Sequence, residues 1–149
     1  MTDTKNSELP FNGEFFFSKN KKFKETVFFV HFYDGGKRNL LRHIRLVNEL
    51  GFDAFAFNFE GTHKNAWNLK LVSPLHKFGM KHMYASQIES LLNLVAGQKI
   101  IFSFSNPSAS AIEAIARRHC SDIKALVCDS GPSDEFVFSA YQLFAHQYH

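Results

Sequence analysis

The residue of this chain that is best placed to do chemistry is a serine between a predicted strand and a predicted helix. Residues 99–105 read KIIFSFS, an apolar run typical of a buried strand. Asn106 and Pro107 follow at once, and proline suits a first helical turn because its missing N–H has no partner there and its φ is already set. This abrupt passage would hold the Ser105 hydroxyl clear of the backbone, beside a helix N-terminus that stabilises negative charge. The pattern therefore indicates a nucleophilic serine.

The residues around Ser105 leave a second interpretation open. The usual sequence of such a turn is G-x-S-x-G, because the turn crowds the two flanking positions. Ser103 and Pro107 stand at those positions here, so one flank is small and neither is glycine. Serine and asparagine are also preferred at the N-terminal cap of a helix. The alternative to catalysis is therefore a structural cap at Ser105.

The elements that must position this serine alternate between strand and helix along the chain. Strands are predicted at residues 26–33, 52–59, 99–105 and 123–128, where apolar and aromatic residues are almost uninterrupted. Apolar residues at helical spacing predict helices that begin near Lys37, Tyr84, Pro107 and Val137. This order predicts an α/β fold, a three-layer sandwich with a mostly parallel sheet. In such a sheet, functional residues gather just beyond the carboxyl ends of the strands.

The composition is that of one folded domain. The chain has 149 residues, of which 45% are hydrophobic and 18 are phenylalanine, and this apolar content excludes a disordered or fibrous chain. We expect a single domain over residues 1–149, with an N-terminal extension at 1–24, a core at 26–132 and a terminal helix at 133–149. The net charge of +3 is smaller than a nucleic-acid-binding domain usually carries. We therefore expect no nucleic-acid partner.

The sequence contains no pattern that predicts a metal, a cofactor or a membrane span. Cys120 and Cys128 do not have metal-ligand spacing, and Glu60 and His63 lack a third ligand nearby. The absence of G-x-G-x-x-G and of a phosphate-binding loop disfavours a flavodoxin-like nucleotide binder. No apolar run approaches the roughly 18 residues of a membrane span, and no secretory signal is visible. We expect a cytoplasmic protein without a cofactor or metal.

At these strand ends the chain resembles the α/β-hydrolase superfamily, over nearly all of residues 26–132. Residues 31–36 (HFYDGG) are similar to the H-G-x-x-G region of that superfamily, and residues 48–57 are similar to its passage from helix through glycine and an aromatic residue into a strand. Residues 59–63 stand where many members carry a D-x-R-G-x-G turn. A Phe-Ser-Asn turn followed by an Asp-Ser-x-Pro strand end is also similar to a less studied branch of the superfamily.

The resemblance implies a role for each strand-end residue. Ser105 would be the nucleophile, and the backbone N–H groups of Tyr33 and Asn106 would form the oxyanion hole that meets charge in the transition state. Asp129 would be the acid, although Asp-Ser-Gly-Pro is also an ordinary turn sequence. The expected substrate-binding residues are His31, Phe32 and Phe104. Because His31 ends an apolar run, an improvised base and a buried core histidine are its alternative roles.

The chain departs from the superfamily at the histidine. Members carry the acid and then the histidine on strand ends after the nucleophile, whereas only His119, His146 and His149 follow Ser105 here. We expect a serine hydrolase or acyl transferase that acts on a small-molecule ester or thioester through an acyl-enzyme on Ser105, with its base supplied by residues absent from this chain.

Two further alternatives stay open at this point. The chain could be a non-catalytic, truncated or degenerate hydrolase-like domain used for binding or assembly, with a second copy covering the exposed edge of its sheet. The apolar stripe from Val137 to Tyr148 is expected to be a packing helix. By the resemblance, the same stripe could begin a lid.

Overall fold

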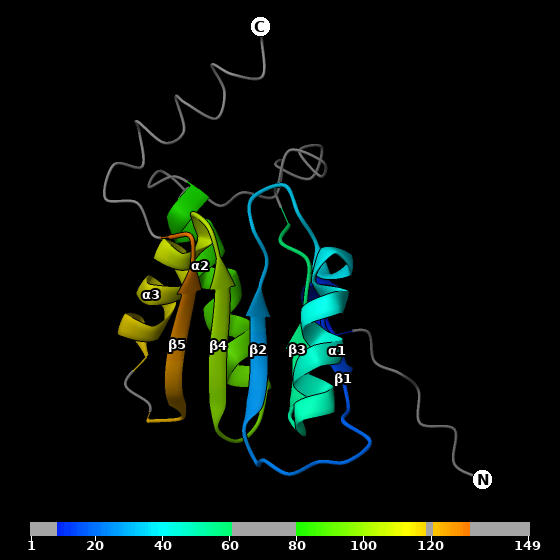
Figure 1. Cartoon of the computed structure of the whole chain (residues 1–149). Helices are drawn as coiled ribbons and strands as arrows, with labels where there is room; N and C mark the ends of the chain where they lie inside the picture. The colour runs from blue at the N-terminus through cyan, green and yellow to red at the C-terminus, as the bar shows by residue number, and fades with distance from the viewer. Residues whose placement is uncertain (1–8, 61–79, 119–120, 132–149) are drawn as a thin grey trace, which may run out of the picture.

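The fold is built on one five-stranded sheet (Figure 1). The computed structural model describes residues 9–60, 80–118 and 121–131. Its strands, in the order β1-β3-β2-β4-β5 across the sheet, are β1 (Glu14–Phe16), β3 (Asp53–Ala56), β2 (Thr26–Val30), β4 (Lys99–Phe104) and β5 (Ile123–Asp129). Strand β1 is antiparallel to β3, and the other neighbours are parallel. The predicted α/β class with a mostly parallel sheet is confirmed.

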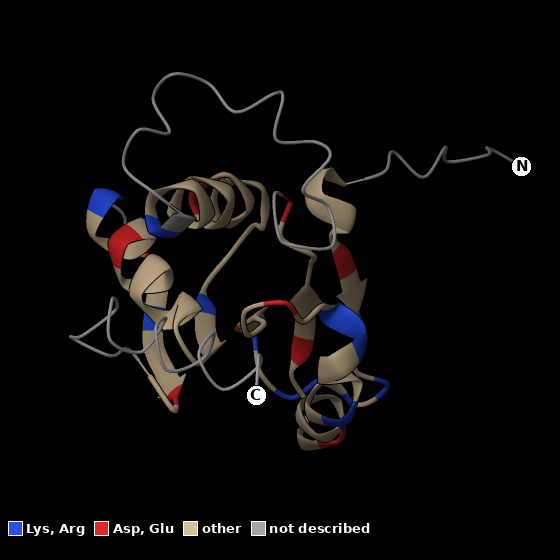
Figure 2. Ribbon diagram, turned by 90° about the horizontal axis from the view of Figure 1, so that it is seen from above, with Lys and Arg blue, Asp and Glu red and all other residues tan. Residues whose placement is uncertain are grey.

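Helices cover both faces of the sheet. The described residues form two short 3-10 helices, η1 (Pro10–Asn12) and η2 (Lys37–Leu40), and three α-helices, α1 (Leu41–Leu50), α2 (Met80–Leu94) and α3 (Pro107–Arg117). Helix α1 packs on one face, and α2 and α3 pack on the other, as Figure 2 shows from above. The predicted three-layer sandwich is therefore confirmed. Among the described residues, no helix is long and apolar enough to cross a membrane.

Phenylalanine fills the core, as the composition predicts. Strand β2 is buried at all five positions because its side chains point alternately to the two helical layers. Phe28 faces α2 and joins Phe55 and Leu91, whereas Phe29 faces α1 and joins Ile44. Complete burial of such a side chain contributes about 2 kcal/mol or more. This packing fixes the height and direction of the strand ends that carry the candidate site.

The structure adds a strand in the segment expected to be an N-terminal extension. Strand β1 pairs with β3 in the register Glu14↔Ala56, Phe15↔Phe55 and Phe16↔Ala54. A three-residue strand is too short to give a period-two pattern, so only its neighbour reveals it. The loop from β1 to β2 carries the lysines at 19–24, and Lys21 forms an ion pair of 2.5 Å with Asp53.

The predicted element ends agree with the structure where local sequence controls them. Helix α1 ends at Gly51, which has φ of +106° and donates its N–H to the carbonyls of Val47 and Asn48. Strand β2 ends at Val30, before the predicted end at residue 33, because its ladder with β4 stops at the pair Val30↔Ser103. The predicted helix from Val137 lies outside the described residues.

Candidate active site

Three turns lie along the carboxyl edge of the sheet. They follow β2, β4 and β5, which are neighbours in that order. The register places Val30 opposite Ser103 and Phe104 opposite Asp129, so the segments that follow start at nearly the same height (Figure 1). A backbone hydrogen bond joins Ser105 to Asp129, and the predicted residues 31–33 lie on the same edge, after the neighbouring strand β2.

The chain turns abruptly at Ser105. Strand β4 ends at Phe104 and α3 begins at Pro107, and Ser105 between them has φ of +58°. This left-handed conformation costs a non-glycine residue roughly 1–2 kcal/mol, and such strained residues are common at functional sites. Two hydrogen bonds hold the turn: the Ser105 N–H donates to the Asp129 carbonyl at 2.7 Å, and the Ser108 N–H donates to the Ser105 carbonyl at 3.0 Å.

The two backbone amides predicted to form an oxyanion hole have no acceptor within the described ranges. Asn106 has helical φ and ψ and precedes α3, so its N–H lies in the first turn, where helical amides lack intrahelical partners. Tyr33 lies three residues beyond the end of β2. Neither N–H is hydrogen-bonded to a described residue. Their predicted role as the two donors of an oxyanion hole stays a prediction.

His31 has structural contacts. It is 0% exposed, its Nδ1 lies 2.7 Å from the Phe32 carbonyl, and its Nε2 accepts the Phe59 N–H at 3.0 Å. These partners require the tautomer that carries its proton on Nδ1. Burial lowers the pKa of His31, against the smaller effect of its bond to the Phe32 carbonyl. The ring thus joins the loop after β2 to Phe59, which follows β3. These contacts are those expected of a buried core histidine.

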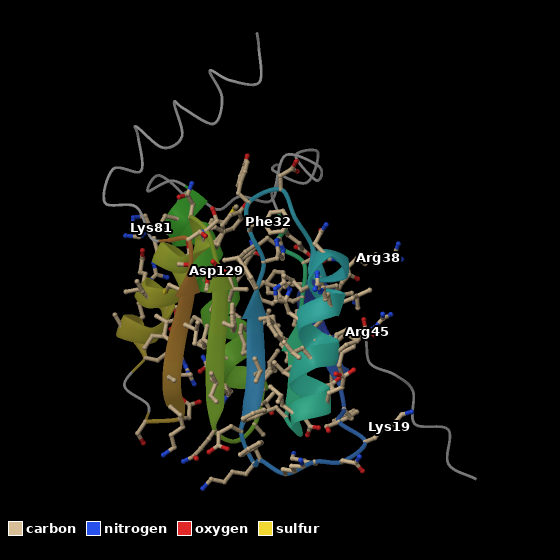
Figure 3. The ribbon with its side chains drawn as sticks, viewed as in Figure 1. Lys19, Phe32, Arg38, Arg45, Lys81 and Asp129 are labelled. Carbon is tan, nitrogen blue, oxygen red and sulfur yellow. The ribbon has the colours of Figure 1, made fainter. Side chains whose placement is uncertain are left out.

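The two predicted phenylalanine contacts differ in exposure. Phe32 is 38% exposed at the top of the loop after β2 (Figure 3), and its ring packs over Gly35, where an added Cβ would lie 2.8 Å from it. Phe104 is 8% exposed and stacks on Phe102 with ring centroids 4.9 Å apart. Phe32 is therefore accessible to a ligand. The substrate contacts predicted for His31 and Phe104 stay predictions.

Asp129 ends β5 with its side chain exposed (Figure 3). Its carboxylate accepts the Ser130 hydroxyl at 3.0 Å, and its carbonyl accepts the Ser105 N–H. The first contact is that of a turn residue, and its role as a catalytic acid stays a prediction. Among the described residues, no group of three His, Cys, Asp or Glu side chains could hold a metal ion. Glu60 is described, whereas its predicted partner His63 lies outside those residues.

Sequence analysis missed Gly131 as a part of this site. An added Cβ at Gly131 would lie 2.8 Å from the carbonyl carbon of Ser105 and closer still to its oxygen, so the two backbones are in contact. Ser130, between Asp129 and Gly131, has φ of +60°. The Asp-Ser-Gly sequence was a visible turn signal, but which backbone the glycine approaches depends on the pairing of β5 with β4.

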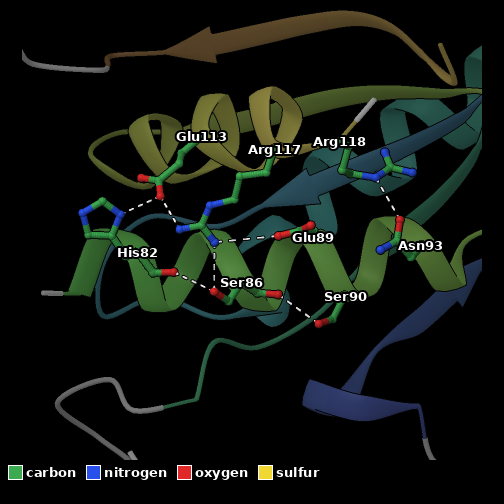
Figure 4. Close-up of polar contacts among 8 residues, drawn as sticks. All are labelled: His82, Ser86, Glu89, Ser90, Asn93, Glu113, Arg117 and Arg118. Carbon is green, nitrogen blue, oxygen red and sulfur yellow. Dashed lines mark hydrogen bonds and ion pairs between the residues drawn. The ribbon is translucent and has the colours of Figure 1, made fainter. Parts of the chain in front are cut away.

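A polar network holds α3 to α2 (Figure 4). Glu113 on α3 is bonded to His82 on α2 at 2.5 Å and to Arg117 one turn further along α3. Burial opposes ionisation of Glu113, but the bonds from His82 and Arg117 outweigh it, so its pKa lies below its usual value. Arg117 also donates to the Ser86 hydroxyl of α2 at 3.0 Å. These contacts fix the direction of α3, whose first turn carries the Asn106 amide.

Comparisons with known proteins agree with this architecture. The chain is similar to the crystal structure of a monoacylglycerol lipase from Paleococcus ferrophilus, with 16% identity and a TM-score of 0.59 over 91% of this chain and 51% of that one. It is similar to a hydrolase from Oleispira antarctica, with 17% identity and a TM-score of 0.58 over 92% of this chain and 52% of that one. No protein-family model and no curated protein matches the chain.

Both structures have the α/β-hydrolase fold, and this chain spans about half of the length of each. At 16–17% identity the likeness shows the fold alone. The chain therefore has the α/β-hydrolase fold across the part of those structures that it spans.

Proposed function

We propose that this chain is the nucleophile-bearing part of a serine hydrolase or acyl transferase that acts on a small-molecule ester or thioester. Ser105 attacks the acyl carbon, and the amides of Tyr33 and Asn106 stabilise the oxyanion. The observation that carries this proposal is the left-handed turn at Ser105, between a parallel strand and a helix, in a fold shared with hydrolases. Each oxyanion donor of this kind is worth about 3–4 kcal/mol of barrier.

The proposed reaction requires a base that the described residues do not supply. A serine hydroxyl is a weak nucleophile until a base takes its proton. Within the described ranges no histidine is hydrogen-bonded to the Ser105 hydroxyl, and His31 uses both of its ring nitrogens in the fold. The base in this proposal therefore comes from residues outside those ranges or from a partner. Phe32, exposed beside the Tyr33 amide, is the substrate contact that the geometry supports best.

Intact-mass measurement after reaction with a fluorophosphonate tests the proposal. In this reaction the serine oxygen forms a bond to phosphorus and fluoride leaves. We expect one adduct on the longest natural form of the chain, absent from Ser105→Ala. Ser90→Ala is the control, because Ser90 is an exposed serine on α2 whose hydroxyl bonds, among the described residues, only to the Ser86 carbonyl of the same helix. A folded sample without an adduct on Ser105 would contradict the proposal.

The second candidate function is a non-catalytic hydrolase-like domain used in binding or assembly. The observation that favours it is the edge strand β5, which has no partner on its outer side among the described strands and leaves Val127 41% exposed. A second copy of the chain, or another protein, that covered this edge would bury the unpartnered side of β5 and the Val127 side chain. This function predicts no ester turnover and a self-associated state in light scattering. Turnover by the 149-residue chain that is lost in Ser105→Ala would exclude it.

A further inference from the structure

The turn after β5 lies directly against the backbone of the candidate nucleophile. Gly131 is packed so closely on Ser105 that a Cβ there would be 2.8 Å from the Ser105 carbonyl carbon, a separation that real Cβ atoms essentially never show. The atoms that block this Cβ belong to the backbone, so no change of rotamer relieves the contact. Two residues earlier, the Asp129 carbonyl accepts the Ser105 N–H at 2.7 Å.

A left-handed non-glycine residue persists only where its surroundings determine it. Ser105 is a residue of this kind, with φ of +58°. The Asp129 carbonyl holds its N–H side, and Gly131 lies against its carbonyl side, so the two contacts restrict both peptide groups of Ser105. The φ of Gly131 is not in the left-handed region. Glycine is therefore required at position 131 because a side chain there would clash with the Ser105 backbone. The φ of residue 131 is itself one that alanine can adopt.

We infer that Asp129 and Gly131 act together as a clamp that positions Ser105, and that Gly131 is a positioning residue of the proposed active site. The clamp acts on the backbone, so it sets both the direction of the Ser105 side chain and the place of the Asn106 amide that follows. The turn at 129–131 thereby connects the edge strand β5 to the nucleophile. Only the effect on reaction rate rests on the proposed function, because the conformational effect is independent of any chemistry.

The variant Gly131→Ala tests the clamp. Moving the carbonyl carbon of Ser105 from 2.8 Å to an ordinary 3.4 Å requires a displacement of at least about 0.6 Å, and the carbonyl oxygen, which is closer to the added Cβ, must move further. Ser105 and Asn106 form the only Ser–Asn pair in the sequence. A sample of the 149-residue chain labelled with 13C-carbonyl serine and 15N-asparagine therefore gives one carbonyl–amide NMR correlation, which reports on both displaced groups. We expect this signal to shift in Gly131→Ala.

Gly97→Ala is the matched control, because Gly97 has φ of +77° and no other atom within 4 Å of an added Cβ. It lowers stability through its backbone without contact to Ser105, so its Ser105–Asn106 signal is expected to stay at the wild-type position. An unchanged signal in folded Gly131→Ala would overturn the inference, as would an equal shift in Gly97→Ala.

Rates of fluorophosphonate labelling separate this inference from the proposed function. If Ser105 reacts, we expect Gly131→Ala to slow labelling at least about tenfold, because misplacement of a reacting group by 1 Å costs about 100-fold. Gly97→Ala is expected to react at the wild-type rate when both are folded. A shifted NMR signal in a protein whose Ser105 never reacts would support the clamp and contradict the proposed function. A wild-type labelling rate in Gly131→Ala would contradict the positioning role.

Discussion

Acidification is expected to destabilise this protein through His31. The ring is completely buried, donates from Nδ1 to the Phe32 carbonyl and accepts the Phe59 N–H on Nε2. A proton added to Nε2 would remove the acceptor and place a charge among the rings of Phe57 and Phe59. Burial accordingly holds the pKa of His31 below its ordinary value of about 6.5.

The sign and the size of the effect follow from the difference between the folded and unfolded chains. Between the lowered pKa and 6.5, the unfolded chain binds a proton that the folded chain does not. The stabilisation from neutral His31 is therefore fully present above pH 6.5, declines as the pH falls through that value, and stops declining below the folded-state pKa. Within this window the loss is about 1.4 kcal/mol per pH unit.

Urea unfolding between pH 7.5 and pH 5 measures this loss. His31→Gln is the comparison, because it removes the titrating ring while other groups continue to titrate. It is expected to be less stable than the wild type at pH 7.5 by about 1–3 kcal/mol, since one polar group is left without a partner. The difference between the two proteins should then shrink as the pH falls. A difference that is independent of pH would refute this account of His31.

Three further predictions concern strain, charge and packing. Ser105→Gly should be more stable than Ser105→Ala by about 1 kcal/mol in thermal unfolding, because only glycine adopts the left-handed φ without cost; equal stability would contradict the strain at this turn. Asp122→Asn should lower the free energy of unfolding by about 1–2 kcal/mol at pH 7, after allowance for solvent screening, because the bonds from Arg118 and Lys99 outweigh burial and lower the pKa of Asp122 to about 2. This stabilisation is present above pH 3.8 and is lost as the pH falls towards 2. A variant that unfolds with the same acid dependence as the wild type would rule out this role of Asp122. Leu91→Ala should cost about 2–5 kcal/mol in urea unfolding, whereas Leu94→Ala on the same helix, 55% exposed, should change stability by less than about 0.5 kcal/mol.

Local sequence predicts the elements of this fold well where one physical cause dominates. The run TVFFV predicts a strand buried on both faces because every side chain in it is apolar or β-branched, and all five positions are buried. Gly51 ends α1 because a left-handed residue closes the helix most easily when it has no side chain. The abrupt change at Asn106 and Pro107 marks the start of α3 for a similarly local reason.

Features that depend on a distant neighbour are not visible in the sequence. Strand β1 has only three residues and is defined by its pairing with β3. His31 could be a base, a ligand contact or a core residue by its type, and its two backbone partners, one of them 28 residues away, decide that its contacts are structural. The importance of Gly131 depends on a contact with a residue 26 positions earlier in the chain.

The sequence by itself determined the alternation of strands and helices, the apolar layers and the position of the sharp turn, because each depends on side chains within a few residues of one another. The tertiary structure decided which turns share an edge, which amides have no acceptor among the described residues and which backbone supports Ser105. Those properties arise from the order and register of the strands, and parallel pairing joins segments that are tens of residues apart. The candidate site is a product of that pairing, since no single segment contains the nucleophile, both proposed amides and the turn that holds them.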